Sequence, residues 1–142
     1  MAVLFKQKLG ALVISGFMAA SSMSAFADYD RGMNAYNSGN YNVALMELQD
    51  AAQEGNTNAQ FQLGEMYRLG QGTRPDPILA IKWLTLAYLY GKQEALPLLE
   101  MLRASVTEEQ LVEAEQSALT WLEEANRTLF KDDDASLLYE QF

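Results

Sequence analysis

The sequence predicts an all-α fold: a short α-solenoid of stacked antiparallel helix pairs, closed by a C-terminal capping helix. Three observations carry this prediction. The chain contains an internal repeat with an offset of 36 residues, alanines and leucines recur at helical spacing within each repeat, and the last long segment has an apolar stripe along one side. Cysteine and histidine are both absent from the 142 residues. Disulfides, thiol nucleophiles, imidazole bases and Cys/His metal clusters are therefore excluded.

The repeat is found by aligning residues 44–55 with residues 80–91. The matched positions are Ala44 with Ala80, Leu45 with Ile81, Leu48 with Leu84, Ala51 with Ala87, and Gly55 with Gly91. Small alanines let neighbouring helices approach closely. Each glycine stands where a helix must end, because glycine adopts the left-handed C-terminal cap without steric cost. A period in the thirties with this pattern is typical of stacked helix pairs.

A nearly apolar helix is predicted over residues 77–90. Asp76 is a suitable N-cap for it, and Pro77 suits the first helical position. Only Lys82 and Thr85 interrupt the apolar run. The length of about 14 residues is too short for a membrane span, so we interpret the segment as a central helix packed on several sides.

Residues 107–130 are expected to form the capping helix. Thr107 and Gln110 have the spacing of a capping box, and Val106 and Leu111 that of a hydrophobic staple. The predicted inward stripe is Leu111, Ala114, Ala118, Trp121, Leu122, Ala125 and Leu129. A stacked array must end in a helix with one solvated face, and this segment fits that role. We expect an acidic tail over residues 131–142, where Asp132–Asp134 can start a short helix.

Residues 1–27 have the pattern of a cleavable secretory signal peptide. Lys6 and Lys8 precede an apolar run over residues 9–20, and small residues then lead to Ala25-Phe26-Ala27. A membrane anchor is the alternative, but a span needs about 20 apolar residues and this run is shorter. We therefore expect the repeat domain, residues 28–130, to be periplasmic or secreted.

The net negative charge of the chain excludes some classes of partner. Removal of Lys6 and Lys8 would leave 19 acidic against eight basic side chains, a net charge of −11. Domains that bind nucleic acid or acidic lipid are basic, so we expect neither as a partner. We also expect no membrane insertion once the signal is cleaved.

The stretch from residue 59 to residue 91 resembles a Sel1-like repeat, a relative of the tetratricopeptide repeat. The resemblance is carried by Ala59, Leu63, Gly64, Met66, Tyr67, Gly70, Gly72, Asp76, Ala80, Trp83, Ala87 and Gly91. Residues 32–51 are closer to the tetratricopeptide pattern, with a shorter turn between the helices, and residues 106–111 resemble the capping helix of Sel1-like arrays. Leu84 stands where an aromatic residue often follows the tryptophan. Pro97 interrupts the third unit, so about two full pairs and a cap are expected.

The resemblance implies an exported adaptor or regulator in a bacterial envelope, which binds a protein or peptide on its concave face. It brings no catalytic residues. Stacked pairs curve, and equivalent first helices then lie side by side on the inner surface. The candidate partner-binding residues are Tyr29, Met33, Tyr36, Glu65 and Arg68. Aromatic, methionine and arginine side chains are typical of interface centres, although the tyrosines could instead complete the core.

Two other functions are considered. A cell-wall glycan enzyme would use paired carboxylates, and the candidates are Glu108/Glu109, Glu113/Glu115 and Glu123/Glu124. Acid–base catalysis needs a carboxyl with a raised pKa in an apolar pocket, whereas these acids are expected on a solvated face. A self-assembling structural envelope protein would be oligomeric, whereas we expect a monomer.

No cofactor or metal is expected. Gly70 and Gly72 do not form a phosphate loop, because a helix and not a strand precedes them and no lysine follows. The acidic run Asp132–Asp134 lacks the alternating spacing and the glycine of a calcium loop.

The export prediction can be checked on the native protein. Cleavage after Ala27 should leave Asp28 as the first residue, because the Ala25-Phe26-Ala27 site follows a basic start and a short apolar run. Mass spectrometry of the protein from its native envelope or medium measures this directly. An intact Met1 in the envelope fraction would show a membrane anchor in place of a cleaved signal.

Overall fold

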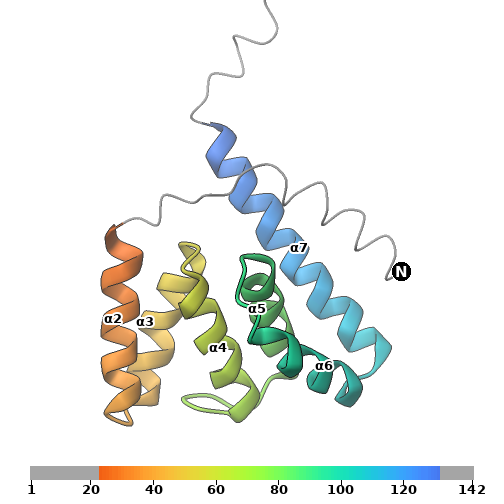
Figure 1. Cartoon of the computed structure of the whole chain (residues 1–142), viewed down its shortest axis with the longest axis horizontal. Helices are drawn as coiled ribbons and strands as arrows, with labels where there is room; N and C mark the ends of the chain where they lie inside the picture. Colours follow the sequence, from red (N-terminus) through yellow and green to blue (C-terminus); the bar gives the residue numbers. More distant parts are fainter. Residues whose placement is uncertain (1–22, 132–142) are drawn as a thin grey trace, which may run out of the picture.

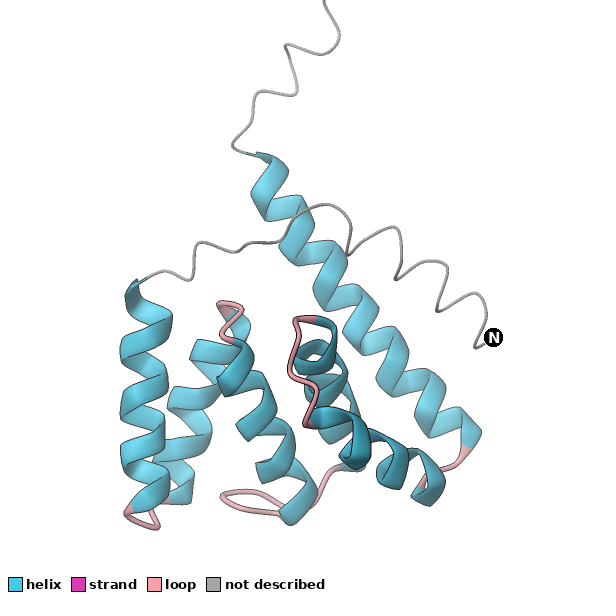
Figure 2. Ribbon diagram, in the orientation of Figure 1, coloured by secondary structure: helices cyan, strands magenta, loops and turns pink. Residues whose placement is uncertain are grey.

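The computed structural model describes residues 23–131, and within that range all regular elements are helices (Figures 1 and 2). They are α2 (Met23–Asn37), α3 (Tyr41–Gln53), α4 (Thr57–Leu69), α5 (Pro77–Leu89), α6 (Ala95–Ser105) and α7 (Glu108–Lys131). Helix α2 pairs with α3 and α4 pairs with α5, α3 joins the two pairs through α4, and α5 also packs on α6 and α7. The pairs stand in a row with α2 at one end and α7 at the other. The all-α solenoid is confirmed.

Left-handed glycines close the tight turns of the stack. Gly55 and Gly91 have φ of 89° and 97°, as their role as helix terminators requires. After α3, the Gly55 N–H donates to Ala52 O at 3.1 Å and the Asn56 N–H donates to Ala51 O at 3.0 Å. The turns after α2 and α5 repeat this pair of hydrogen bonds. These backbone groups would otherwise lack partners, so each glycine fixes where one helix stops and the next begins.

The predicted helix starts are also confirmed. Asp76 Oδ1 accepts hydrogen bonds from the backbone N–H of Ile78 and of Leu79, both at 3.0 Å, and Pro77 is the first residue of α5. At α7, the Gln110 N–H donates to Thr107 Oγ1 at 3.2 Å, and the Thr107 N–H donates to Gln110 Oε1 at 3.1 Å. This reciprocal pair is the capping box.

Helix α5 lies at the centre of the core. Seven of its residues are buried: Ala80, Ile81, Trp83, Leu84, Thr85, Leu86 and Ala87. This confirms the interpretation of residues 77–90 as a helix packed on several sides, with the last residue of the helix at Leu89. Leu84 is completely buried and Trp83 is 3% exposed.

A glycine–leucine contact sets the spacing within each pair. A Cβ on Gly32 of α2 would lie 2.6 Å from Leu48 Cγ of α3, and a Cβ on Gly64 of α4 would lie 2.6 Å from Leu84 Cγ of α5. Real Cβ atoms do not approach other atoms this closely, so only glycine fits at either position. The same contact occurs in both pairs, although the intervening turn has three residues (38–40) in the first and seven (70–76) in the second.

The longer turn of the second pair locks it against the first pair. Gly72 has φ of 75°, and a Cβ there would overlap the backbone carbonyl of Tyr41 at the start of α3. The Tyr36 hydroxyl of α2 is 3.1 Å from Gln71 Oε1 in the same turn. Residues 70–72 therefore fix the position of α4 relative to the α2–α3 pair.

The capping helix packs against α5, with a wider buried stripe than the sequence predicts. Ala114, Ala118 and Leu122 are buried as expected, and Leu119 is buried as well. Val106 and Leu111 are half-buried against the core. The third unit is short: α6 has no side-chain N-cap, and Pro97 is its third residue, where proline is tolerated. The tail expected to start a helix at Asp132–Asp134 lies outside the described residues.

Helix α2 begins before the predicted mature N-terminus. Ala25 is fully buried, its carbonyl is 3.4 Å from Asn56 Nδ2, and Ser24 Oγ donates to Glu54 Oε2 at 2.7 Å. Cleavage after Ala27 would remove these contacts and leave α2 starting at Asp28. Among the described residues, no helix combines the length and hydropathy needed to cross a membrane.

Leu84→Ala should lower the free energy of unfolding by about 2–5 kcal/mol, because it removes a completely buried side chain from the central helix. Urea unfolding followed by circular dichroism measures the change. A loss below about 0.5 kcal/mol would mean that the α5 packing described above is wrong.

The glycine–leucine contact predicts that two substitutions will not be additive. Gly64→Ala alone should cost about 1–3 kcal/mol, because its Cβ collides with Leu84. In the Gly64→Ala/Leu84→Ala double variant the collision is gone, so the combined loss should fall short of the sum of the single losses by about 1 kcal/mol or more.

Gly39→Ala is the matched control for this cycle. Gly39 is also unfavourable for alanine, since its φ is 74°, but a Cβ there meets nothing within 4 Å. Its cost should therefore add to that of Leu84→Ala within about 0.5 kcal/mol. Simple additivity in the Gly64 cycle would show that this contact does not determine the helix spacing.

Candidate partner-binding site

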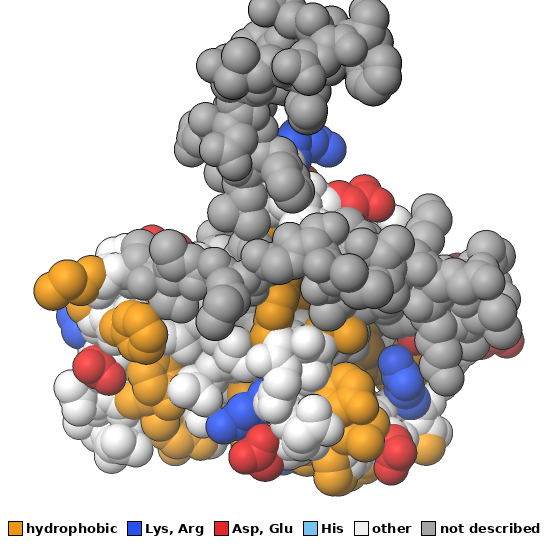
Figure 3. Space-filling view, turned by 45° about the horizontal axis from the view of Figure 1, so that its top comes forward, with side chains coloured by type: hydrophobic (Ala, Val, Ile, Leu, Met, Phe, Trp, Pro, Cys, Tyr) orange, Lys and Arg blue, Asp and Glu red, His pale blue; other side chains and the backbone are white. Residues whose placement is uncertain are grey.

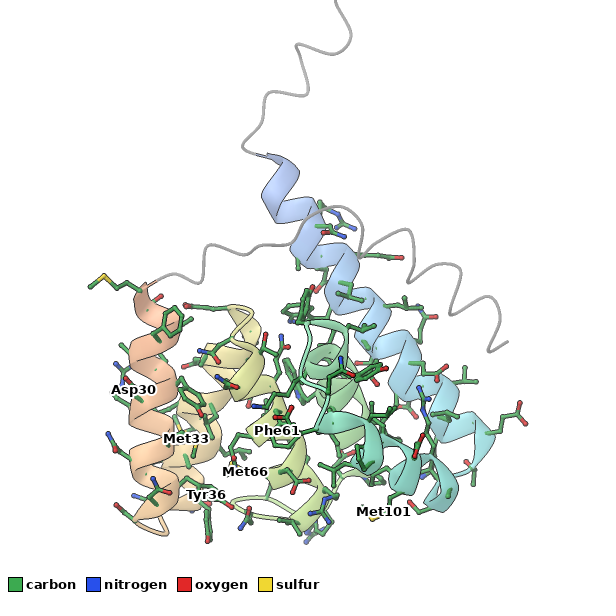
Figure 4. All side chains as sticks on the ribbon, viewed as in Figure 1. Asp30, Met33, Tyr36, Phe61, Met66 and Met101 are labelled. Atoms are coloured by element: carbon green, nitrogen blue, oxygen red, sulfur yellow. The ribbon has the colours of Figure 1, made fainter. Side chains whose placement is uncertain are left out.

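Helix α2 presents the first three candidate residues along one side. Tyr29, Met33 and Tyr36 are separated by steps of four and three, so they share a helix face. All three are half-buried and pack against the core, and Met33 and Tyr36 lie on the side of α2 toward α4 (Figure 4). Each contributes part of its surface to the fold and part to solvent.

Helix α4 presents the other two candidates as a two-pronged ion pair. Arg68 Nε and Nη2 donate to Glu65 Oε1 and Oε2 at 2.7 and 2.9 Å. The side chains are 23% and 20% exposed. The hydrogen bonds that Arg68 donates to Glu65 raise the pKa of Arg68, with burial acting in the opposite direction. The pair holds a guanidinium in a fixed orientation at the surface, which is the pre-organised state that binding requires.

The two helices run side by side in the same direction. At their N-terminal ends, the Asn56 side chain that caps α4 is 3.4 Å from Ala25 O in α2. At their C-terminal ends, the Tyr36 hydroxyl bonds Gln71, one turn beyond Arg68. The structure therefore places the five candidate residues on two adjacent first helices, with Tyr36 nearest the end that carries the ion pair.

Tyr36 has a structural role that the sequence does not reveal. Besides its bond to Gln71, its ring lies 5.2 Å from that of Tyr41, at an interplanar angle of 60°. It thus joins α2 to α3 and to the turn after α4. The tyrosines therefore do contribute to the core in part, as the sequence analysis allowed. Tyr36 does so through the largest number of described contacts.

A second group of side chains extends the α4 surface. Lys92 Nζ donates to Asn58 Oδ1 at 3.1 Å and lies 5.4 Å from the centre of the Phe61 ring. Asn58, Phe61, Glu65 and Arg68 follow one another at steps of three and four, so they form one stripe along α4. Helical spacing alone identifies this stripe. Lys92 reaches it only because the turn after α5 folds back beside the start of α4.

We call the surface formed by these two helices the first-helix face. It comprises Tyr29, Met33 and Tyr36 of α2 and Asn58, Phe61, Glu65 and Arg68 of α4. The aromatic and apolar side chains of α2 lie beside the α4 stripe, in which Phe61 is flanked by the polar Asn58 and by the charged Glu65–Arg68 pair. A view of the molecule with its top brought forward likewise shows hydrophobic side chains in several groups, separated by polar and charged ones (Figure 3).

The candidate catalytic carboxylates are mostly exposed on α7. Five of the six glutamates on α7 are exposed, as expected, but Glu115 is half-buried and accepts a hydrogen bond from Arg103 Nη2 at 3.2 Å. Burial raises the pKa of Glu115, and the charge of Arg103 opposes this. The expectation that all these acids are solvated is wrong for Glu115, because Arg103 of α6 reaches across to it. Glu113 is exposed and stands two positions away, so the two carboxylates of this pair point to different sides of α7.

Within residues 23–131 no group of three or more acidic side chains is placed to hold a metal ion. The acidic run Asp132–Asp134 lies outside that range.

Comparison with known proteins identifies the central pair. A search of curated proteins finds no similar sequence. Residues 57–92, which comprise α4, the long turn, α5 and the turn that follows, match the family model of the Sel1 repeat. Sel1 repeats are generally protein–protein interaction modules and are typically non-enzymatic. The matched span contains the Gly64–Leu84 contact, the Asp76 cap and the α4 part of the first-helix face, and residues 57–92 are therefore a Sel1 repeat.

Proposed function

We propose that the protein is an exported adaptor or regulator that binds another protein, or a peptide, on its first-helix face. The observation that carries the proposal is the pre-organised stripe on α4, where Phe61 and the Glu65–Arg68 pair stand beside the tyrosines of α2. Sel1 repeats bind proteins generally, which supports this class of partner.

The side chains of this face suit an interface centre. Tyrosine, phenylalanine, methionine and arginine are enriched in the buried centres of interfaces, where each can cover a large area. Arg68 is already held by Glu65, so little side-chain freedom is lost when a partner binds. The guanidinium has five N–H donors and directs two of them to Glu65. The others can reach a backbone carbonyl or a carboxylate of the partner.

The net charge of the chain and its signal pattern indicate the charge and the location of the partner. The chain carries a net charge of −9, and loss of Lys6 and Lys8 with the signal would make it −11. Long-range attraction then favours a partner with a basic surface and weakens as salt is added. The signal pattern supports a periplasmic or secreted location, where the partner would be an envelope or extracellular protein.

The proposal is tested with a partner obtained by co-purification from the native envelope or culture fraction. Arg68→Ala and Tyr29→Ala should each weaken binding of that partner by about 2 kcal/mol or more, roughly 30-fold in Kd, because both remove central anchors. Calorimetric titration measures Kd, and circular dichroism confirms that each variant folds.

Arg127→Ala is the matched control, since Arg127 is an exposed arginine on α7 away from this face. It should leave Kd within about twofold of wild type. If Arg127→Ala or Glu113→Ala on α7 weakens binding while the two face variants bind normally, the partner docks on the acidic outer helix and the first-helix assignment is wrong.

A further inference from the structure

A cavity of about 450 Å³ lies on a different part of the fold, between α3, α5 and α7. Its lining residues are Gln53, Lys82, Trp83, Trp121, Glu124 and Ala125. They come from the second helices of the two pairs and from the capping helix, and the first-helix face shares no residue with them. The volume is within the range of small-molecule sites. An inference about this cavity is therefore independent of the proposed partner-binding function.

Aromatic rings form one wall of the cavity. The Trp83 and Trp121 rings meet edge to face, with centroids 6.5 Å apart and planes at 69°. Tyr90 contacts Trp121 in a similar way at 6.3 Å. Trp83 is almost completely buried and Trp121 is half-buried. Trp121 is thus held in place by its aromatic neighbours while part of its surface stays open to the cavity.

Two opposite charges line the same space. Lys82 is the one charged residue of the apolar helix α5, and its Nζ lies 4.7 Å from the centre of the Trp83 ring. Burial lowers the pKa of Lys82, and the nearby charge of Glu124 counteracts this. A half-buried ammonium on the most apolar helix is unfavourable for stability, and a hydrophobic side chain there would pack against the same rings. Because this unfavourable ammonium of Lys82 lines a cavity, its position indicates that it binds a ligand there.

We propose that this cavity binds a small zwitterion, an apolar α-amino acid or a short peptide carrying both end charges. The ligand carboxylate pairs with Lys82, its ammonium with Glu124, and its apolar side chain lies against Trp121. Gln53 at the end of α3 supplies an amide that can bond either charged end.

Other ligand classes fit the lining less well. Glu124 and the net charge of −9 repel a simple anion, while Lys82 repels a simple cation. A neutral sugar could lie against Trp121 but would form no ion pair with Lys82 or Glu124. A zwitterion satisfies both charges and is not repelled by the overall field of the protein.

The test uses the fluorescence of the protein itself, because the two tryptophans of the chain both line the cavity. The probes are L-leucine, L-methionine and L-phenylalanine, with glycyl-L-leucine as the peptide form. At least one should change the tryptophan emission saturably. For the best amino acid, the amide lacks the carboxylate and the N-acetyl derivative lacks the ammonium. Each should bind about tenfold more weakly than the parent.

Variants assign each charge to its residue. Lys82→Met should bind the amino acid about tenfold more weakly and should no longer distinguish it from its amide. Glu124→Gln should no longer distinguish it from the N-acetyl derivative. Glu113→Gln, an exposed carboxylate of the same helix outside the cavity, should bind like wild type. Circular dichroism should show all three variants folded, since none removes a buried apolar contact.

The outcomes separate the ligand sources. Tighter binding of glycyl-leucine, with the same dependence on Lys82 and Glu124, would support the proposal and identify a peptide as the ligand. The proposal is overturned if none of the four probes gives a saturable change, or if amide and N-acetyl derivative bind as well as the parent. It is also overturned if N-acetylglucosamine binds as tightly as the best amino acid, which would make the cavity a sugar site.

Discussion

A glycine on the first helix of each pair allows one leucine of the second helix to pack against the bare backbone, and the geometry of the stack depends on this close approach. Gly32 receives Leu48 and Gly64 receives Leu84 at nearly identical distances. Small alanines then continue the contact along the pair, because Ala44, Ala51, Ala80 and Ala87 are all completely buried. The leucine at position 84, which departs from the aromatic residue often found there in Sel1-like repeats, is the side chain that this glycine pocket accommodates.

The turns between the helices hold them in the positions that the glycine–leucine contacts set. Tight turns with a left-handed glycine return the chain after α2, α3 and α5, and each satisfies its helix end with the same two hydrogen bonds. The longer turn after α4 instead reaches across to the first pair, where Gly72 passes the backbone of Tyr41 and Gln71 meets Tyr36. As a result α2 and α4 stand in register, and separate residues on two helices become one continuous face.

Local signals predicted much of this fold, and tertiary docking accounts for what they missed. The caps at Asp76 and Thr107 depend on backbone groups within three residues, so the sequence was sufficient to find them. The burial of Leu119 and Glu115 depends on how α7 lies across α5 and α6, which helical periodicity does not determine. The candidate residues on α2 and α4 were predicted from spacing, whereas the bonds of Tyr36 to Gln71 and of Lys92 to Asn58 join residues more than 30 positions apart. The sequence showed Lys82 only as an interruption of an apolar helix, because the cavity that it lines forms only where α7 docks on α5.

The shortness of the array explains why its two faces can differ in chemistry. With only two clear pairs, α5 is both the last second helix and the surface on which the capping helix docks. Leu84 of α5 packs into the core, and the preceding residue, Trp83, meets Trp121 of α7. A longer solenoid would cover that part of α5 with the next repeat. A cap that brings its own tryptophan and glutamate converts the end of the stack into a polar-lined space. The two proposals therefore use separate parts of the fold, the first-helix face for a macromolecular partner and the cavity beside α7 for a small ligand.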